Sequence, residues 1–517
     1  MKHLMFAVMF LGLCGFVFAQ SGETATPQWR PVYHFTPEKN WTNDPNGPIY
    51  LNGEYLLYNQ QNPFENKWGH MSWGHARSKD LLRWEHLPVA IPEKIDREKG
   101  DTVWIFSGSA VWDRNNTSGF CRGGGCLVAI YTAHQPNLKK ESQYIAYSND
   151  GGKSYTNYAG NPVIDLHKRD FRDPNVFWHK ASKQWVMAVA IPAEHKVHFY
   201  GSPNLKNWTL LSEFGPQGFV GAHWECPSLI ELPVKGGGTR WVLMNSAAGG
   251  QRGVFMQYYV GTFDGKTFVN DNASDKVLTV DYGDCFYAAI PWNNMPDEGK
   301  VLIGWMVPGK QKTAPWTGQM SISRDMSLKK TANGYRLLQE PAAIVRKGLP
   351  SGPVEKKDAA LSGDVAVNVS GNAYWLDAEI DLGTATTAGF KIAQGKDATG
   401  MVVSETVIGY DKVKQEVFVD RSRSSRDGVK PERTRQTIAL SGGEVSGAGG
   451  GAGVAAAGKV RLRILFDKSS LEVFVNDGEQ VLTDYIYPDE GAFGCAVFAE
   501  GGNAVVRDMK IWDLSKL

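Results

Sequence analysis

Apolar and polar residues alternate with a period of two in the last third of the chain. Apolar side chains occupy every second position in 460–466 and again in 471–475. The segment 476–478 reads Asn-Asp-Gly, a strong signal for a tight turn between antiparallel strands. Because this period puts one face of each strand toward a core, we predict a β-sandwich over 355–517. A Gly/Ala-rich tract at 447–458 interrupts the pattern and is expected to form a loop.

A second pattern recurs through the first two thirds of the chain. A strand-like stretch ends in Ser or Thr, an Asp or Asn stands two positions later, and an aromatic residue follows after the turn. Four copies begin at Ser78, Ser148, Ser202 and Thr262, and Ser323 opens a fifth copy that lacks the aromatic residue.

The recurrence, at roughly 50–70 residues, predicts one antiparallel sheet per copy. The Asp or Asn turns the chain, and the aromatic ring packs against the sheet. Five copies therefore predict five propeller blades over 27–340, followed by a linker in the Gly/Pro-rich segment 348–353. Ordinary hairpins in another all-β fold are the alternative.

Composition agrees with this all-β fold class, a five-bladed β-propeller followed by a C-terminal β-sandwich. The chain has 517 residues, of which 42% are hydrophobic, enough for the cores of two domains. Its 57 Gly, 17 Trp, 19 Tyr and 23 Phe favour turn-rich sheets over helical bundles. The formal net charge is only +1, and without a basic excess we expect no nucleic-acid partner.

The N-terminus has the pattern of an export signal. Lys2 and His3 precede an apolar run over 4–18, and 17–19 reads Val-Phe-Ala, like a small-residue cleavage site. We predict a signal peptide over 1–19 and a secreted or periplasmic protein. Elsewhere no stretch approaches about 18 uninterrupted apolar residues, so we expect no membrane span in the mature chain.

The six Cys do not form a disulfide scaffold, because loss of Cys14 with the signal leaves an odd number. Cys121 and Cys126 flank four residues, Arg-Gly-Gly-Gly, and either close a small loop or stay as two thiols. There is no Cys-x-x-Cys pair or His/Cys spacing that would suggest zinc.

Three acidic residues stand in unusual surroundings. Asp44, Asp173 and Glu225 are each flanked by Trp, Phe, Arg or Cys rather than by polar residues. Such neighbours shift carboxyl pKa values, and glycosidases use shifted carboxyl pairs to divide the roles of nucleophile and acid. Taken singly, each acid is explained by an Asp-Pro turn or a local ion pair. Because the three open different predicted blades, we expect them to converge in the central channel.

Several segments resemble, in order, the signature blocks of glycoside hydrolase family 32, the β-fructofuranosidases. They are 41–47, 106–109, 171–174, 224–227 and 281–288. The resemblance spans nearly the whole mature chain and implies a five-bladed propeller with a β-sandwich, hydrolysis with retention of configuration, and a fructan or sucrose substrate. It implies no metal and no cofactor.

Functional residues follow from this resemblance by motif. Asp44 would be the nucleophile, Glu225 the general acid/base and Asp173 a stabiliser of the transition state. Cys226 is expected to pack beside Glu225. The residues expected to bind the fructosyl unit are Asn43, Gln60, Trp68, Phe106, Ser107, Arg172 and Trp305.

The motifs leave several activities open. The levanase and inulinase end of the family fits best, so we expect exo-acting hydrolysis of levan or inulin and also of sucrose. An endo-fructanase or a fructosyltransferase would use the same three carboxylates. An inverting arabinan-type propeller enzyme and a non-catalytic fructan-binding protein are more distant alternatives. Ser228 replaces the Asp of many relatives and is expected to alter the aglycone side of the site.

Overall fold

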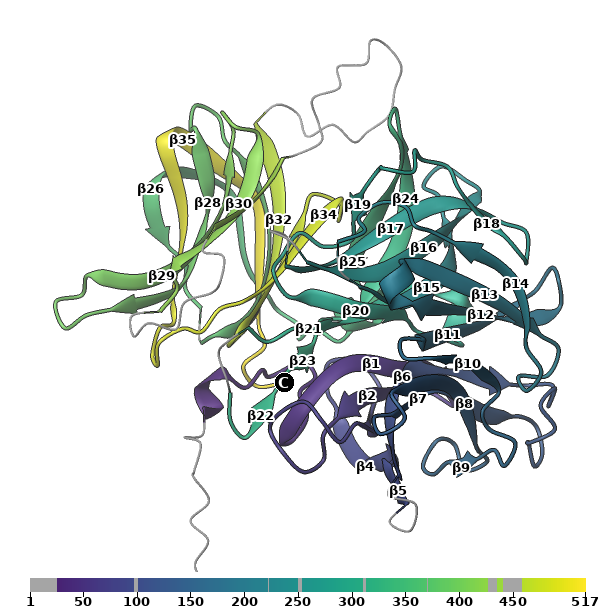
Figure 1. Ribbon diagram of the computed structural model, residues 1–517. Helices are drawn as coiled ribbons and strands as arrows, with labels where there is room; N and C mark the ends of the chain where they lie inside the picture. Colours follow the sequence, from purple (N-terminus) through teal and green to yellow (C-terminus); the bar gives the residue numbers. More distant parts are fainter. Residues whose placement is uncertain are drawn as a thin grey trace, which may run out of the picture.

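The computed structural model describes residues 26–96, 101–221, 223–249, 253–309, 313–369, 371–425, 435–439 and 458–517. Figure 1 shows a propeller, coloured purple to blue-green, beside a sandwich coloured green to yellow. The predicted all-β fold class, five blades followed by a sandwich, is confirmed. The predicted signal peptide at 1–19 and the Gly/Ala tract up to residue 457 lie outside the described residues.

Five antiparallel sheets form the blades. The first contains β1 (Asn40–Leu51), β2 (Glu54–Gln61), β3 (Ser72–Ser78) and β4 (Glu85–Ile91). The second contains β5 (Lys94–Asp96), β6 (Asp101–Asp113), β7 (Cys126–Gln135), β8 (Lys140–Ser148), β9 (Thr156–Asn157) and β10 (Ile164–Lys168). The third contains β11 (Arg172–His179), β12 (Gln184–Ile191), β13 (Lys196–Ser202) and β14 (Thr209–Phe214).

The last two blades are built in the same way. The fourth contains β15 (Trp224–Pro233), β16 (Thr239–Ala248), β17 (Val254–Phe263), β18 (Phe268–Asn270) and β19 (Leu278–Thr279). The fifth contains β20 (Phe286–Pro291), β21 (Val301–Met306), β23 (Gln319–Met320), β24 (Arg324–Thr331) and β25 (Gly334–Pro341). Short helices are η1 (Pro27–Trp29), η2 (Pro192–Glu194), η4 (Pro296–Glu298) and, after the propeller, α1 (Ala343–Lys347).

The innermost strands β1, β6, β11, β15 and β20 contact one another in a ring. The ring is closed by β22 (Trp316–Thr317), which follows β21 in sequence but pairs in parallel with the start of β1 in the first blade. The first and last blades are thus joined by hydrogen bonds, and the starts of the innermost strands meet around one channel.

The repeated Ser/Thr-x-Asp/Asn motif forms the turn after the third strand, counted from the innermost strand, in each of the first four blades. In the first blade, Ser78 Oγ accepts the Leu81 N–H at 2.8 Å, and Asp80 Oδ1 accepts the Leu82 and Arg83 N–H groups at 2.9 and 2.8 Å. These side chains replace the hydrogen bonds that the turning backbone cannot make to a neighbouring strand, which explains the recurrence of the motif.

The predicted start of the fifth copy at Ser323 is wrong. Ser323 precedes β24, which is the third strand of the fifth blade, whereas the equivalent turn lies after that strand. There Thr331 Oγ1 accepts the Asn333 N–H at 3.2 Å, and Gly334 adopts a φ of 93°. The turn is shorter than in the other blades, so its aromatic residue, Tyr335, comes too early to match the repeat.

The C-terminal domain is a sandwich made from one continuous hydrogen-bonded sheet. Its strands are β26 (Val354–Ala366), β27 (Ala373–Asp381), β28 (Thr387–Lys396), β29 (Val402–Asp411), β30 (Glu416–Arg423), β31 (Arg435–Ala439), β32 (Lys459–Asp467), β33 (Ser470–Val475), β34 (Gln480–Tyr485) and β35 (Gly494–Asp513). The first part of β35 pairs with β28 and the second with β27, so one long strand serves both layers. It crosses between them at Gly501 and Gly502, whose φ values are 70° and 152°.

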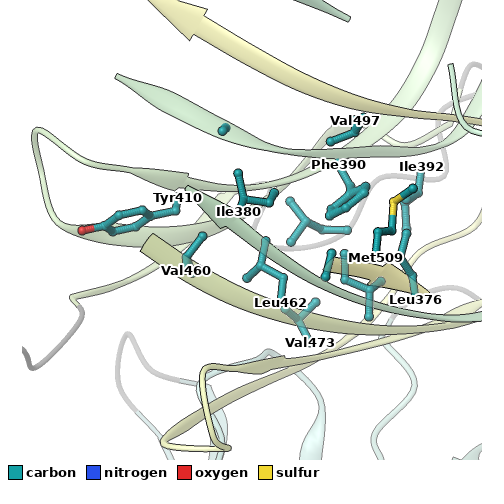
Figure 2. Packing of buried hydrophobic residues seen from close by; sticks show 14 of the residues in the cluster. Leu376, Ile380, Phe390, Ile392, Tyr410, Val460, Leu462, Val473, Val497 and Met509 are labelled. Carbon is teal, nitrogen blue, oxygen red and sulfur yellow. The ribbon is translucent and has the colours of Figure 1, made fainter. Parts of the chain in front are cut away.

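The alternating apolar positions in 460–466 and 471–475 point into the sandwich core, as predicted. Figure 2 shows Val460, Leu462 and Val473 packed against Phe390 and Val497 from other strands. The predicted turn at 476–478 joins β33 to β34.

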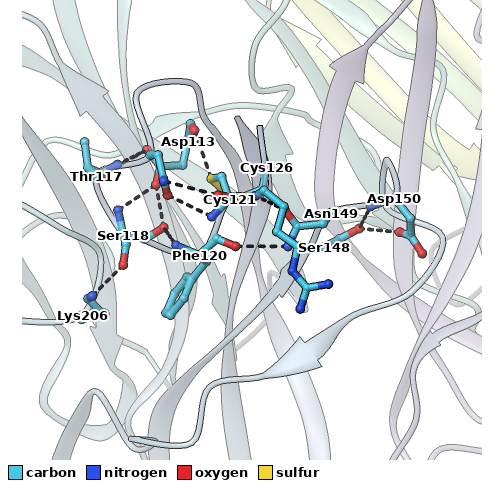
Figure 3. Close-up of a disulfide and its surroundings, with 12 residues drawn as sticks. Asp113, Thr117, Ser118, Phe120, Cys121, Cys126, Ser148, Asn149, Asp150 and Lys206 are labelled. Atoms are coloured by element: carbon cyan, nitrogen blue, oxygen red, sulfur yellow. Dashed lines mark hydrogen bonds between the residues drawn. A yellow bond between two sulfur atoms is a disulfide. The ribbon is translucent and has the colours of Figure 1, made fainter. Parts of the chain in front are cut away.

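Cys121 and Cys126 form a disulfide, the first of the two arrangements that the sequence left open. Figure 3 shows the loop that it closes between β6 and β7. The buried Asp113 carboxylate holds the same loop, because it accepts hydrogen bonds from the backbone and hydroxyl groups of Thr117 and Ser118. The remaining described cysteines, at 226, 285 and 495, are buried thiols.

A buried cluster of charges joins the two domains. Arg324 of the propeller is fully buried and donates to Asp281 Oδ2 at 2.8 Å and to Glu472 Oε2 of the sandwich at 2.6 Å. His34, which precedes the propeller, lies 2.9 Å from both Asp467 and Glu472. Breaking such a buried network leaves uncompensated charges, so these contacts hold the sandwich in one position against the propeller.

We expect His34 to make the stability of this interface depend on pH. Burial alone would lower its pKa, but hydrogen bonds and charges from Asp467 and Glu472 raise the pKa to about 9 from 6.5. Protonated His34 thereby contributes about 3 kcal/mol to the free energy of unfolding. This contribution is fully present below pH 6.5 and is lost as the pH rises through about 9. The midpoint temperature of thermal unfolding should therefore fall between pH 7 and 9.5 more steeply for the wild type than for His34→Gln. Parallel curves for the two proteins would contradict this expectation.

Candidate active site

Each of the five innermost strands contributes one polar side chain to the same end of the channel. Hydrogen bonds and charge interactions connect these side chains to one another. They are Asp44 of β1, Ser107 of β6, Asp173 of β11, Glu225 of β15 and Tyr287 of β20. Three acids that are far apart in sequence therefore gather where the ring of strands brings the strand starts together.

The regular pairing of every innermost strand is interrupted at this point. The register shifts lie at Thr42–Pro45, Ile105–Gly108, Arg172–Asn175, Glu225–Ser228 and Tyr287–Ile290. A bulge bends a strand and re-aims its side chains, and bulges are frequent beside active sites. Asp173 and Cys226 adopt positive φ values of 66° and 47°, as functional residues held by their surroundings often do.

Asp44 is half-buried and accepts hydrogen bonds from its neighbours. Its Oδ2 accepts a hydrogen bond from Ser107 Oγ at 2.5 Å. Desolvation raises the pKa of Asp44, whereas the hydrogen bonds from Ser107 and Asn43 act against that rise. Asn43, a predicted binding residue, is itself fixed by the Trp41 indole, whose Nε1 donates to its Oδ1 at 2.9 Å.

Asp173 is 6% exposed and is held by the residue that follows Glu225. Its Oδ2 accepts the Cys226 N–H at 2.9 Å, and Cys226 Sγ lies 3.6 Å from Asp173 Oδ2 and 3.7 Å from Asp44 Oδ2. The thiol expected to pack beside Glu225 thus also contacts both aspartates. Desolvation raises the pKa of Asp173, Arg172 lowers it, and the charges of Glu225 and Asp44 raise it further, with a net rise.

Glu225 is fixed at both carboxylate oxygens. Arg172 Nε and Nη2 donate to its Oε1 at 3.1 and 3.0 Å, and the Tyr287 hydroxyl donates to its Oε2 at 2.7 Å. The side chain remains 27% exposed, so one side of the carboxylate reaches the pocket. Burial alone would lower the pKa of Arg172, but the surrounding carboxylates raise it above the usual value, so the guanidinium stays charged.

Three further predicted binding residues, Gln60, Trp68 and Phe106, come from the first two blades. Gln60 is buried and donates from Nε2 to the Ile105 carbonyl at 2.9 Å. Trp68 is 51% exposed, and its ring lies 6.0 Å from that of Phe106. Phe106 in turn stacks on His134 with 4.3 Å between ring centroids. These rings form an aromatic wall on one side of the site.

Trp305 and Ser228 differ in burial: Trp305 is partly exposed, whereas Ser228 is fully buried. Trp305, on β21, pairs across the sheet with Tyr287, and its ring lies 6.1 Å from that of Trp41. Its buried Nε1 has no hydrogen-bond partner among the described residues. Ser228 is fully buried within β15. The expectation that it changes the aglycone side stays a prediction, and with its side chain buried any such effect would be indirect.

Sequence reasoning missed Tyr287 and the pair formed by His134 and Glu141. Tyr287 lies inside the quoted block 281–288, so the motif contained its signal, but only the fold shows that its hydroxyl reaches Glu225. Glu141 Oε2 accepts a hydrogen bond from Arg172 Nη1 at 3.2 Å, and Glu141 Oε1 lies 3.2 Å from His134 Nδ1. No motif distinguishes these two residues from ordinary strand positions.

No group of three His, Cys, Asp or Glu side chains in the described ranges could hold a metal ion. Within the same ranges, the helices are too short or too polar to cross a lipid bilayer.

A cavity of about 770 Å³ opens at the opposite end of the channel, between the ends of β6, β11 and β15. It contains none of the three acids.

Clustered carboxyl groups at one site are the arrangement that most glycoside hydrolases use. Residues 34–341 match the N-terminal domain of the glycosyl hydrolases family 32, and residues 343–513 match its C-terminal domain. The chain therefore belongs to glycoside hydrolase family 32 and is a hydrolase of the β-fructosidase type.

The relatives extend over nearly all of the chain. It is 42% identical over 541 residues to a levanase of Bacillus subtilis (strain 168), and the alignment covers 100% of this chain and 76% of that protein. It is 37% identical to an extracellular exo-inulinase of Aspergillus ficuum, with 97% of each covered.

Solved structures of relatives share the fold. The exo-inulinase of Aspergillus awamori superposes with a TM-score of 0.84 at 36% identity, covering 94% of this chain and 98% of that one. A fructofuranosidase of Schwanniomyces occidentalis, complexed with fructose, gives 0.83 at 30% identity, with 95% and 99% covered.

We expect Asp173→Asn to stabilise the fold. The raised pKa of Asp173 means that its ionised form is less stable in the folded chain than in the unfolded chain. This penalty is absent below the ordinary value of 3.8 and grows as the pH rises above it. The midpoint of thermal unfolding should exceed that of the wild type by a few degrees at pH 8 and by less at pH 4.5. A variant that is less stable than the wild type at pH 8 would contradict this account of the site.

Proposed function

We propose that the protein is an exported, exo-acting β-fructosidase that releases terminal fructose from levan-type or inulin-type fructans and from sucrose with retention of configuration. The observation that carries this proposal is the convergence of Asp44, Asp173 and Glu225 at one end of the channel within a family 32 chain.

In the first step, an Asp44 oxygen attacks the anomeric C2 of the fructosyl unit. The bond from C2 to the leaving oxygen breaks while Glu225 transfers its proton to that oxygen. Asp44 suits this role because the Ser107 hydroxyl and Asn43 hold its carboxylate in one orientation and oppose the rise in its pKa. The product of the step is a covalent fructosyl ester of Asp44.

In the second step, water attacks C2 from the side that the leaving group vacated. Glu225 accepts the proton of that water, and the bond between C2 and Asp44 breaks, which regenerates both carboxyl groups. Two displacements at C2 retain its configuration. Tyr287 and Arg172 hold Glu225 at both oxygens, so the same carboxyl group can serve as acid and then as base.

Asp173 would bind ring hydroxyls as positive charge develops on the sugar. A buried carboxylate in a site of low dielectric stabilises such charge strongly. Asn43, Gln60, Ser107 and Trp305 would fix the remaining hydroxyl groups, and the aromatic wall of Trp68 and Phe106 would bound the sugar that leaves.

The choice of fructans rests on the relatives. The similar proteins are named levanase and exo-inulinase, and the similarity covers both domains. An export role is supported by the apolar segment 4–18, by relatives named extracellular and by the Cys121–Cys126 disulfide, since disulfides persist in oxidising compartments.

Incubation of the purified protein with levan, inulin and sucrose, followed by chromatography, tests this proposal. We expect fructose as the first and main product from at least one substrate. Oligofructosides as first products would favour the endo-acting or transferring alternatives. Release of no sugar from any of the three would overturn the proposal.

Asp44→Asn should lower kcat by at least about 10³-fold, because the amide cannot form the covalent intermediate. The thermal unfolding midpoint should stay at or above the wild-type value, since the fold raises the pKa of the Asp44 carboxyl and so disfavours its ionised form. Asp264→Asn, in an exposed turn of the fourth blade, is the matched control and should keep full activity. Equal activity of Asp44→Asn and the control would remove Asp44 from the mechanism.

A further inference from the structure

Glu141 is a buried carboxylate with no role in the steps above. It lies on β8 of the second blade and is 2% exposed. Its Oε2 accepts the Phe171 N–H at 2.8 Å, directly before the bulge that carries Asp173. Its Oε1 lies 3.2 Å from Nδ1 of His134, its partner across the sheet.

Arg172 lies between this carboxylate and Glu225. Two of its nitrogens, Nε and Nη2, donate to Glu225, while Nη1 donates to Glu141 Oε2 at 3.2 Å and to Asp170 Oδ1 at 3.1 Å. The Asp170 side chain is 37% exposed, so solvent screens its charge, whereas the Glu141 side chain is 3% exposed. Glu141 is therefore the stronger competitor of Glu225 for the guanidinium.

We propose that Glu141 is a positioning residue that acts through Arg172: it divides the guanidinium charge between two carboxylates and so keeps the Glu225 proton available for transfer. The inference rests on the proposed function, in which Glu225 must be protonated at the start of the reaction.

The physical argument concerns which charges act on Glu225. An unshared Arg172 would stabilise the Glu225 carboxylate fully and favour loss of its proton. The negative charge of Glu141 offsets part of that effect, both by drawing the guanidinium and by repelling a second negative charge nearby. The groups that face Glu225 directly are Arg172 and Asp173 of β11, Tyr287 of β20, Asp44 of β1 and Cys226 of β15.

The position of Glu141 also connects the acid/base to the aromatic wall. His134, which contacts Glu141, stacks on Phe106 with only 4° between the ring planes. One carboxylate thus contacts the bulge of the third blade, the arginine of the acid/base and the wall of the second blade. Glu141 is thus placed to fix the orientation of Arg172 and His134 and to influence the charge around Glu225 without contacting the sugar.

The test is the pH dependence of kcat/KM for the wild type, Glu141→Gln and Asp170→Asn, on whichever of levan, inulin and sucrose the wild type cleaves fastest. Gln keeps an oxygen that can accept from Phe171 and Arg172 but removes the charge. We expect Glu141→Gln to move the alkaline limb of the profile to lower pH by about 1 unit. The KM at the optimum should stay within about twofold, and Asp170→Asn should move the limb by less than a third as much.

An unmoved limb in Glu141→Gln, or an equal shift in Asp170→Asn, would overturn the inference. If the glutamine variant does not fold, Glu141→Met supplies an uncharged side chain of similar length with the same expected shift. Glu141→Asp, which keeps the charge, should retain the wild-type limb even where it lowers stability. A wild type without turnover would count against both the proposed function and this inference, whereas an active wild type with an unmoved limb would count against the inference alone.

Discussion

Three carboxyl groups cannot occupy one desolvated pocket unless their mutual repulsion is offset, and this constraint accounts for most of the site. Arg172 supplies the positive charge, and its donors are divided between Glu225 and Glu141. The Ser107, Cys226 and Tyr287 side chains add neutral donors to individual oxygens. Desolvation, and after it the charges of the neighbouring carboxylates, still raises the pKa values of Asp44 and Asp173, so this arrangement is maintained against local stability.

The propeller supports this arrangement because it brings five strand starts to one point and lets each strand bulge there. A bulge in a single isolated hairpin would fray, whereas here the closing strand β22 and the buried contact of Arg324 with Asp281 and Glu472 hold the ring from outside. None of the described sandwich residues makes a hydrogen bond to the trio. The sandwich contacts the fifth blade, which carries Tyr287, through Glu472 on Arg324 and the Tyr485 hydroxyl on the Met306 carbonyl.

The sequence predicted the fold class well because the relevant signals are local. Period-two alternation at 460–466 and the turn at 476–478 depend only on neighbouring residues, and the structure bears both out. The fifth repeat was misplaced at Ser323 because the real turn after Thr331 is shorter. Tyr287, Glu141 and the direction of the Cys226 thiol could not be predicted, since each depends on bulges that turn side chains between blades.

The central claim is that Asp44 and Glu225 act on one anomeric carbon in two successive displacements. The most direct measurement follows the anomeric form of fructose by NMR in the first minutes of hydrolysis, before the free sugar equilibrates. The account predicts that β-fructofuranose accumulates first and then converts to the other forms. The α anomer as the first product would show a single displacement and would contradict the roles given to both residues.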